Sequence, residues 1–270
     1  MLEEKLESLK EILRSLESVV IAYSGGVDST LLSKVAFDVL GDNALAITAR
    51  SETYPRSELE DAIKLAKKIG IRHETIASEE LDIPEFSDNP VNRCYYCKKE
   101  LLTKLKGIAK ERGFKHVVEG ANFDDLDDYR PGMEAVAELD VRSPLKEAKL
   151  TKADIRELSK RLGLPTWDKP SFACLSSRFP YGTKITREKL KAVGEAEMFL
   201  KTFGVRQLRV RHHDRIARIE VTEEDMGLLL QNRDQITKKL KELGFTYVTM
   251  DLQGYRTGSM NEVLREDATT

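Results

Sequence analysis

The chain has 270 residues, enough for one large domain or two modest ones. Hydrophobic residues make up 40% of it and charged residues 33%, a balance typical of a globular protein with a real core. The net charge of −2 lacks the basic excess of a dedicated nucleic-acid binder, and no apolar run approaches the roughly 20 residues that cross a bilayer. Three cysteines, an odd number, argue against a complete disulfide framework, so we expect a protein of the reducing cytoplasm.

The first 168 residues alternate short apolar runs with helical stretches. Leucines at helical spacing predict a helix at 2–16 that packs on its own domain. Glycines at 41 and 70 mark two later helix ends. The expected strands are 19–23, 44–48, 72–76 and 116–119, with a fifth near Val141, and the further expected helices are 28–40, 57–69, 97–112 and 151–162. This alternation predicts an α/β domain at 1–168, with a parallel sheet flanked by helices.

The second part of the chain, 169–270, has a different pattern. A long loop at 164–184 contains three prolines, which is typical of a functional segment. The elements expected after it are a helix at 186–203, a hairpin of strands 205–211 and 215–221, a helix at 222–243 and a strand at 245–252. We therefore interpret 169–270 as a small α+β domain.

A glycine-rich loop, SGGVDS at 24–29, follows the first strand and opens a helix. Gly25 and Gly26 let the backbone approach an anion closely, and the free N–H groups at the helix start stabilise negative charge. Asp28 would repel a phosphate unless a cation lay between them, so we expect a magnesium ion there. Hydroxyl groups able to donate to phosphate oxygens belong to Ser24, Ser29 and Thr30.

The loop lacks the glycine–lysine ending of a Walker A motif and does not fit the dinucleotide fingerprint. It resembles the PP-loop of the N-type ATP pyrophosphatases, which share the HUP fold of adenine nucleotide α-hydrolases. Members of that class adenylate a substrate oxygen and release pyrophosphate. Because ligands favour the carboxyl ends of parallel strands, we also place the loop 120–125 at this site. The nucleotide contacts expected outside the residues already named are Ala22, Val27, Ala49, Ser51, Gly120, Asn122 and Asp125.

The three cysteines are candidates for one shared site. Cys94 and Cys97 form a CxxC motif just before a predicted helix, whose N-terminus favours thiolates, and Cys174 lies in the long loop. No histidine has zinc-ligand spacing to them, so a zinc site would lack its fourth ligand. Three thiolates suit a [4Fe-4S] cluster with one open iron, which can hold a transferable hydrosulfide. Spacing alone leaves open three incidental or redox-active thiols.

Several stretches together resemble the LarE family, the ATP-dependent sulfur transferases of nickel-pincer nucleotide biosynthesis. They are SGGVDSTLL, NRCYYCKKELL, EGANFDDLDDYRPG, KPSFACLSSRFPYGT, RVRHHDRIARIEV and GYRTGSMN, and they span most of the chain. The resemblance implies a substrate, pyridinium-3,5-biscarboxylic acid mononucleotide, whose carboxylates are adenylated and converted to thiocarboxylates. It also implies a homohexamer, and it associates coenzyme A with the nucleotide site.

The resemblance offers two sulfur sources. One branch of the family sacrifices the sulfur of a cysteine that matches Cys174. Another branch has three cysteines, matching Cys94, Cys97 and Cys174, and holds a [4Fe-4S] cluster. Because this chain has all three, we favour the cluster, with Cys174 and Asp28 as the catalytic candidates and sulfide or another donor as sulfur supply. The sacrificial route stays open.

The second domain is expected to bind the mononucleotide and to mediate oligomerisation. Arg209 and Arg211 are two residues apart on a predicted strand and so share a face, where arginine forks suit phosphate and carboxylate. Arg178 and Glu220 complete the expected substrate contacts. A solvated hairpin with cross-strand charge pairs is the alternative. His212 and His213 are expected in an exposed turn.

Three other functions fit parts of the pattern. A tRNA thiolase of the PP-loop class can share the loop, the CxxC and a later cysteine, but this chain lacks an evident basic RNA-binding module. An amide-forming enzyme such as an NAD synthetase would leave the cysteines idle. A nucleotide-binding module without catalysis would release no pyrophosphate.

Overall fold

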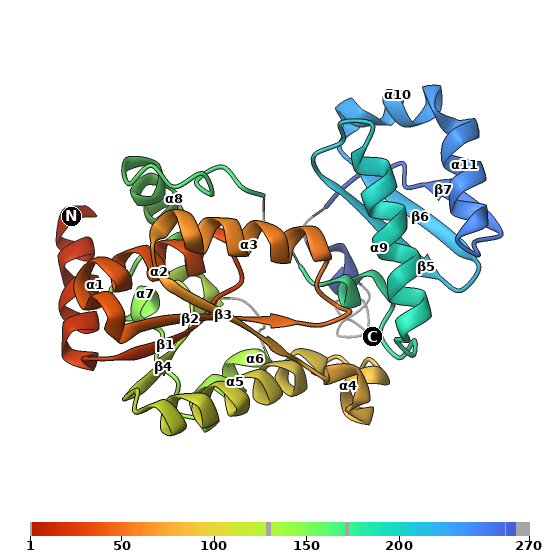
Figure 1. The fold of residues 1–270 in the computed structure, drawn as a ribbon. Helices are drawn as coiled ribbons and strands as arrows, with labels where there is room; N and C mark the ends of the chain where they lie inside the picture. Colours follow the sequence, from red (N-terminus) through yellow and green to blue (C-terminus); the bar gives the residue numbers. More distant parts are fainter. Residues whose placement is uncertain (1, 128–130, 171–172, 257, 263–270) are drawn as a thin grey trace. The chain divides into compact units, whose positions relative to one another are not determined.

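The computed structural model describes residues 2–127, 131–170, 173–256 and 258–262 (Figure 1). The chain divides into two compact units. The first consists of Met1–Phe86 and Asn92–Phe172, and the second of Ser87–Val91 and Ala173–Thr270. A short piece of the N-terminal half therefore belongs to the second unit, which no local sequence pattern indicated.

The first unit contains a parallel four-stranded sheet in the order β3-β2-β1-β4. Its strands are β1 (Val19–Ala22), β2 (Ala44–Arg50), β3 (Arg72–Ala77) and β4 (His116–Val118). The predicted α/β class and parallel pairing are confirmed, with Val19 opposite both Ala44 and His116. The expected fifth strand near Val141 is reduced, within the described residues, to a single bridge between Val118 and Arg142.

Helices cover both faces of this sheet, with α1, α2, α3 and α8 on one side and α5 and α6 on the other (Figure 1). Side chains of β1 alternate between two cores, because Val19 and Ile21 join the α1–α2 cluster while Val20 joins the α5 cluster. None of the helices in the described part of the chain is long and apolar enough to span a membrane. The α-helices described between residues 2 and 161 are α1 (Leu2–Leu16), α2 (Val27–Leu40), α3 (Arg56–Ile69), α4 (Pro84–Ser87), α5 (Arg93–Arg112), α6 (Gly132–Glu138), α7 (Pro144–Glu147) and α8 (Lys152–Arg161).

Local signals account for most helix ends. Gly70 ends α3 in the left-handed conformation, at φ +88°, and Thr151 begins α8 through a capping box with Asp154. The expected start of α5 was wrong, since the helix begins at Arg93 instead of Cys97. Arg93 is buried and so anchors an additional turn. The CxxC motif therefore lies within the helix and does not precede it.

The second unit has a three-stranded sheet in the order β5-β6-β7, with β5 (Leu208–His213) antiparallel to β6 (Ile216–Val221) and β7 (Tyr247–Met250) parallel to β6. The predicted hairpin is thus present. The predicted helix at 222–243 is two helices, because the side chain of Asn232 donates to the carbonyl of Leu228 and ends the first one. The helices of this unit are α9 (Arg187–Lys201), α10 (Glu223–Gln231) and α11 (Arg233–Glu242).

Asn89 fixes the segment Ser87–Val91 within the second unit. It is fully buried with φ +58°, and its amide nitrogen lies 2.7 Å from the carbonyl oxygen of Pro180. Its own carbonyl accepts from the N–H of Gly182 at 2.9 Å. The chain therefore packs against the loop that follows Cys174 just before it forms the CxxC helix.

Candidate functional site

The glycine-rich loop joins β1 to α2 in the arrangement that the sequence predicted. Gly26, at the N-cap position, has an extended backbone and no side chain to cap α2, so the first helical N–H groups can meet an anion. The hydroxyl oxygens of Ser24 and Ser29 lie 3.1 Å apart, and the Ser29 hydroxyl donates to the carbonyl of Gly26 at 3.3 Å. These contacts hold the loop in shape before any ligand arrives.

Two glycines allow other segments to approach this loop closely. Gly25 has φ +65°, and a Cβ there would lie 2.9 Å from the Cβ of Ala62 on α3. At Gly120, a Cβ would lie 3.1 Å from the backbone nitrogen of Ser29. Space therefore favours glycine at both positions, and at Gly25 the left-handed backbone favours it as well.

The packing at Gly25 yields a prediction for stability. Gly25→Ala should lower the free energy of unfolding by about 2 kcal/mol or more, because the left-handed backbone costs roughly 1–2 kcal/mol and the contact with Ala62 adds to it. Urea denaturation measures the loss. Gly163→Ala is the matched control, since Gly163 has φ +67° but a Cβ there would meet no heavy atom within 4 Å. Equal losses in the two variants would contradict the close packing.

The Asp28 carboxylate pairs with a positively charged side chain of the same unit, that of Lys152. Its Oδ2 lies 2.5 Å from Nζ of Lys152, and its Oδ1 accepts from the side-chain amide of Asn122 at 3.3 Å. The sequence interpretation missed Lys152. A signal for it existed, because Lys152 is the first residue of α8, where the helix dipole disfavours a positive charge.

The geometry fits a magnesium ion at Asp28. The bound ammonium group shows that this carboxylate accommodates a cation, and magnesium prefers carboxylate, phosphate and water oxygens. Among the described residues, no group of three or more His, Cys, Asp and Glu side chains is arranged to hold a metal. A magnesium ion that uses phosphates and waters does not need such a group.

The loop after β4 is built around Asn122. Its N–H donates to Oδ2 of Asp125 at 2.9 Å, and its side-chain oxygen accepts from the N–H of Asp124 at 2.9 Å. Asp124 also accepts from the N–H of Lys152 at 2.8 Å. The structure thus brings Asn122 to Asp28, whereas the carboxylate of Asp125 shapes the loop. The acidic residues of this loop continue in the sequence from Asp124 to Asp128, and Asp128 lies outside the described residues.

The other predicted nucleotide contacts differ in exposure. Ala22 ends β1 and is half-buried, Ala49 lies within β2, and the hydroxyl of Ser51 lies 2.9 Å from that of Thr53. Val27 and Thr30 are buried, and the N–H of Thr30 already donates to the carbonyl of Gly26 at 3.0 Å, so of these two residues only Val27 can offer a backbone N–H to a ligand at the loop.

Two side chains that sequence reasoning missed also contact the loop. The hydroxyl of Tyr54 donates to the carbonyl of Ser24, and Nζ of Lys169 donates to the carbonyl of Gly25 at 3.2 Å. Burial, followed by the nearby charge of Glu58, raises the pKa of Tyr54, so its hydroxyl stays protonated and can donate. Lys169 also pairs with Glu58 on α3 at 2.8 Å. The glycine-rich loop 24–29, hereafter the phosphate loop, is therefore held from α3 as well as from α8.

The three cysteines are all free thiols, and they belong to different units. Cys94 is exposed and Cys97 half-buried, three residues apart on α5, so they share one face of the helix. Cys174 is half-buried in the second unit. Its carbonyl accepts from the N–H of Ser177 at 3.0 Å and from the guanidinium of Arg178 at 3.2 Å, which fixes its backbone.

Two of the predicted substrate arginines make buried ion pairs. Both branches of the Arg211 guanidinium meet the Glu220 carboxylate, at 3.0 and 2.9 Å. Arg178 meets Glu197 in the same bidentate way, at 2.7 and 2.9 Å. Glu197 was missed, although its position on the apolar stripe of α9, between Val193 and Leu200, was a signal for a paired buried carboxylate.

Arg209 is the more accessible arginine of this group. Its guanidinium lies over the ring of Tyr255, 5.2 Å from the centroid, and donates to the hydroxyl of Ser177 at 3.3 Å. Arg218 shares Glu220 at 3.0 Å and lies 3.7 Å from Asp251. Arg178, Arg209, Arg211 and Arg218 thus have three neighbouring carboxylates, from Glu197, Glu220 and Asp251. The excess of positive charge suits an anionic ligand.

The expectation for His212 and His213 was wrong. Both belong to β5, and the turn consists of Asp214 and Arg215. His212 is buried between the rings of Phe179 and Phe245, with centroids 5.2 and 5.3 Å away. Burial lowers the pKa of both histidines, so both are neutral near pH 7; His212 is a core residue, and His213 is half-buried.

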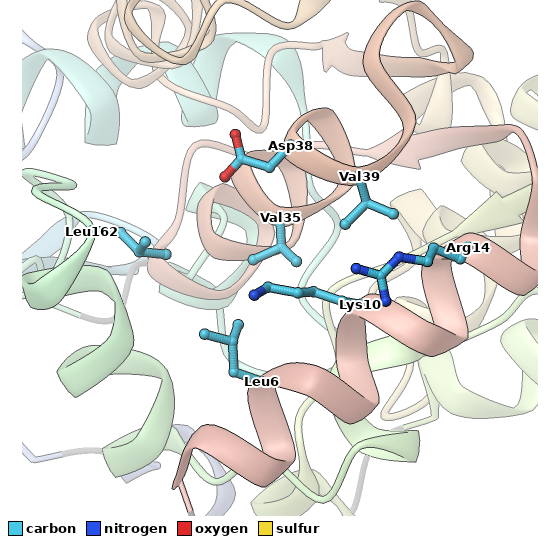
Figure 2. A pocket seen from close by; sticks show the side chains of 7 residues that line it. All are labelled: Leu6, Lys10, Arg14, Val35, Asp38, Val39 and Leu162. Atoms are coloured by element: carbon cyan, nitrogen blue, oxygen red, sulfur yellow. The ribbon is translucent and has the colours of Figure 1, made fainter.

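A pocket of about 350 Å³ lies between α1 and α2, away from the phosphate loop (Figure 2). The side chains of Lys10 and Arg14 from α1 face those of Val35 and Asp38 from the C-terminal half of α2. The described residues that line it include none of the predicted site residues. The loop expected to bind the nucleotide lies at the other end of α2.

The parallel sheet, the loop at the carboxyl end of β1 and the helix that follows it without a side-chain cap are those of the PP-loop class. The sequence model of the NAD synthase family matches residues 1–90. The chain is 49% identical to an uncharacterised protein of Synechocystis, over 98% of this chain and 99% of that protein. It is 40% identical to the pyridinium-3,5-bisthiocarboxylic acid mononucleotide synthase of Lactiplantibacillus plantarum, over 97% of this chain and 96% of that synthase. The chain therefore belongs to the family of that synthase, the LarE family.

Proposed function

We propose that the protein converts pyridinium-3,5-biscarboxylic acid mononucleotide into the bisthiocarboxylic acid mononucleotide at the expense of ATP. The observation that carries this proposal is the match, along nearly the whole of both chains, to a synthase of that product. The phosphate loop supports the use of ATP, and the arginine-rich face of the second unit supports an anionic substrate.

Activation of the substrate is assigned to the first unit. A substrate carboxylate oxygen attacks the α-phosphorus of ATP, and pyrophosphate leaves with the electrons of the broken P–O bond. The N–H groups at the start of α2 hold phosphate oxygens, and Asp28 binds magnesium in place of Lys152. Lys152, once released, is close enough to neutralise a phosphate. The acyl adenylate makes AMP the leaving group, which a free carboxylate lacks.

Delivery of sulfur is assigned to the cysteines. A [4Fe-4S] cluster on Cys94, Cys97 and Cys174 would supply sulfide from its open iron. The helical spacing of Cys94 and Cys97 fits two ligands on one face, and Arg178 holds the backbone of Cys174. In the alternative route, the Cys174 thiolate itself attacks the acyl carbon and then loses its sulfur, leaving dehydroalanine.

Substrate binding is assigned to the second unit. Arg209 and Arg211 are proposed to hold phosphate or carboxylate groups of the mononucleotide, with Arg178 and Glu220 completing the site. Because Arg178 and Arg211 already pair with carboxylates, we place the first contact at Arg209. A homohexamer, coenzyme A at the nucleotide site and a cytoplasmic location stay predictions from the family resemblance.

Turnover in the absence of oxygen tests the proposed function. Purified protein is mixed with ATP, magnesium and the biscarboxylate mononucleotide, and the products are analysed by mass spectrometry. We expect AMP, pyrophosphate and a mononucleotide in which sulfur replaces carboxylate oxygen. Unchanged mononucleotide, with thiolated tRNA formed when tRNA is supplied instead, would favour a tRNA thiolase.

A further inference from the structure

An ion pair between a half-buried lysine and a buried glutamate joins the helix that carries the CxxC to the loop that contacts Asp28. Lys98 follows Cys97 on α5, and its Nζ lies 2.7 Å from Oε2 of Glu119. Glu119 comes directly after β4 and is only 4% exposed. Lys98 lies one helical turn from Cys94, at the i, i+4 spacing that puts two residues on the same face. One partner of the ion pair, Lys98, therefore lies on the turns of α5 that carry the two cysteines.

Glu119 is held on its other oxygen as well. Oε1 accepts from the hydroxyl of Ser143 at 2.5 Å and from the N–H of Ala121 at 3.1 Å. Burial by itself would raise the pKa of Glu119, but the charge of Lys98 and these hydrogen bonds outweigh it, so the pKa lies below its usual value. The carboxylate is therefore charged near neutral pH, where it can pair with Lys98.

The link continues to the phosphate loop in two short steps. Gly120 packs its backbone against that of Ser29, and Asn122 donates to Asp28. At the other end, a Cβ at Gly132 would lie 3.2 Å from Cδ of Lys98, so the start of α6 confines the lysine side chain. Figure 1 shows α6 beside α5 in this unit. Lys98 therefore has little freedom to move independently of Glu119.

We propose that Lys98 is a positioning residue that couples nucleotide binding at Asp28 to the CxxC turns of α5. Magnesium and ATP must displace Lys152 from Asp28, which changes the charge that Asn122 faces. When Asn122 shifts, the loop 119–122 shifts with it. Lys98, paired with Glu119 in this loop, passes the shift to α5. Packed side chains with hydrogen bonds carry such coupling between sites. This inference rests on the proposed function only in taking ATP to bind at the phosphate loop.

Amide hydrogen exchange, followed by mass spectrometry, measures the coupling in the full chain. The probe is magnesium with α,β-methylene ATP, an analogue that cannot release pyrophosphate. In the parent protein we expect the probe to slow exchange by roughly fivefold or more in peptides covering 24–30 and also 93–101. In Lys98→Met the first effect should remain, and the effect on 93–101 should be lost.

Lys99→Met is the matched control. Lys99 is the next residue on α5 and also makes an ion pair, with Glu138 at 2.7 Å, but that pair is exposed and leads to α6. This variant should respond to the probe as the parent does. The Lys98→Met variant leaves the buried Glu119 carboxylate unpaired and can fail to fold for that reason. In that case the double variant Lys98→Met/Glu119→Gln, which removes both charges, takes the place of the single variant in the test.

The outcomes separate this inference from the proposed function. Protection of 93–101 that persists in both Lys98 variants would overturn the coupling, as would a parent protein that shows protection at 24–30 alone. Either result leaves sulfur insertion untouched. A parent protein with no protection at 24–30 would overturn the coupling and also contradict ATP binding at the loop, on which the proposed function depends.

Discussion

Asp28→Ala is expected to abolish the pyrophosphate release that ATP and the biscarboxylate mononucleotide produce. Asp28 is the carboxylate at the phosphate loop that pairs with the ammonium group of Lys152, and a magnesium ion held there would neutralise charge on the phosphates. Loss of several kcal/mol of such stabilisation lowers the rate by roughly a hundredfold or more. A coupled assay for pyrophosphate measures the loss.

Two further variants make the result specific. Asp28→Asn keeps the shape of the side chain and loses its charge, so it should be nearly as inactive as alanine. Asp38→Ala removes a carboxylate from the other end of the same helix, where it pairs with Lys34, and should retain full activity. Pyrophosphate release at the parent rate in Asp28→Ala would show that another group binds the metal.

Variants of Lys152 are less informative about catalysis. Lys152 and Asp28 are partly exposed, with side-chain exposures of 35% and 22%, so their pairing adds little to stability. The ammonium group serves better as a marker of the metal position. The pairing also explains how an acidic residue can remain in a phosphate-binding loop in the absence of ligand.

The elements that the sequence predicted correctly depend on local chemistry. The run Val19–Ile21 is apolar without alternation, which is typical of a strand buried on both faces of a parallel sheet, and the structure places it there. Gly70 and Thr151 mark helix ends through conformations that glycine and threonine favour. The phosphate loop was recognisable because the strand, the glycines and the helix are contiguous in the chain.

The parts that the sequence did not reveal depend on contacts between distant residues. The sequence placed Asn122 at the same site as Asp28 but did not reveal their hydrogen bond, and it did not reveal the pairing of Asp28 with Lys152. His212 looked like part of a polar turn, but its ring fills space between Phe179 and Phe245. Asn89 packs in the second unit with the rest of Ser87–Val91, although the chain on both sides of this short segment belongs to the first unit.

The second strong prediction concerns the cysteines. If a cluster supplies the sulfur, Cys94→Ser should lose sulfur insertion and keep pyrophosphate release, because activation depends on the phosphate loop and the bound substrate and not on the cysteines. Protein purified without oxygen should be brown with about four irons per chain, and the variant should lose most of this iron. Iron analysis and mass spectrometry of the nucleotide product provide the two measurements. Tyr95→Phe, in the same turn of α5, is the control and should keep iron and activity.

The sacrificial route predicts the opposite pattern. There, Cys94→Ser remains active for one round, colourless protein works, and Cys174 loses the mass of H₂S after turnover. Cys174→Ser is inactive in sulfur insertion under both routes, so it cannot separate them, whereas Cys94 lies in the other unit and matters only to a shared cluster. Pyrophosphate release is the internal reference for each variant, since a protein that still adenylates its substrate has kept its fold. Loss of sulfur insertion with adenylation intact would assign Cys94 to sulfur delivery.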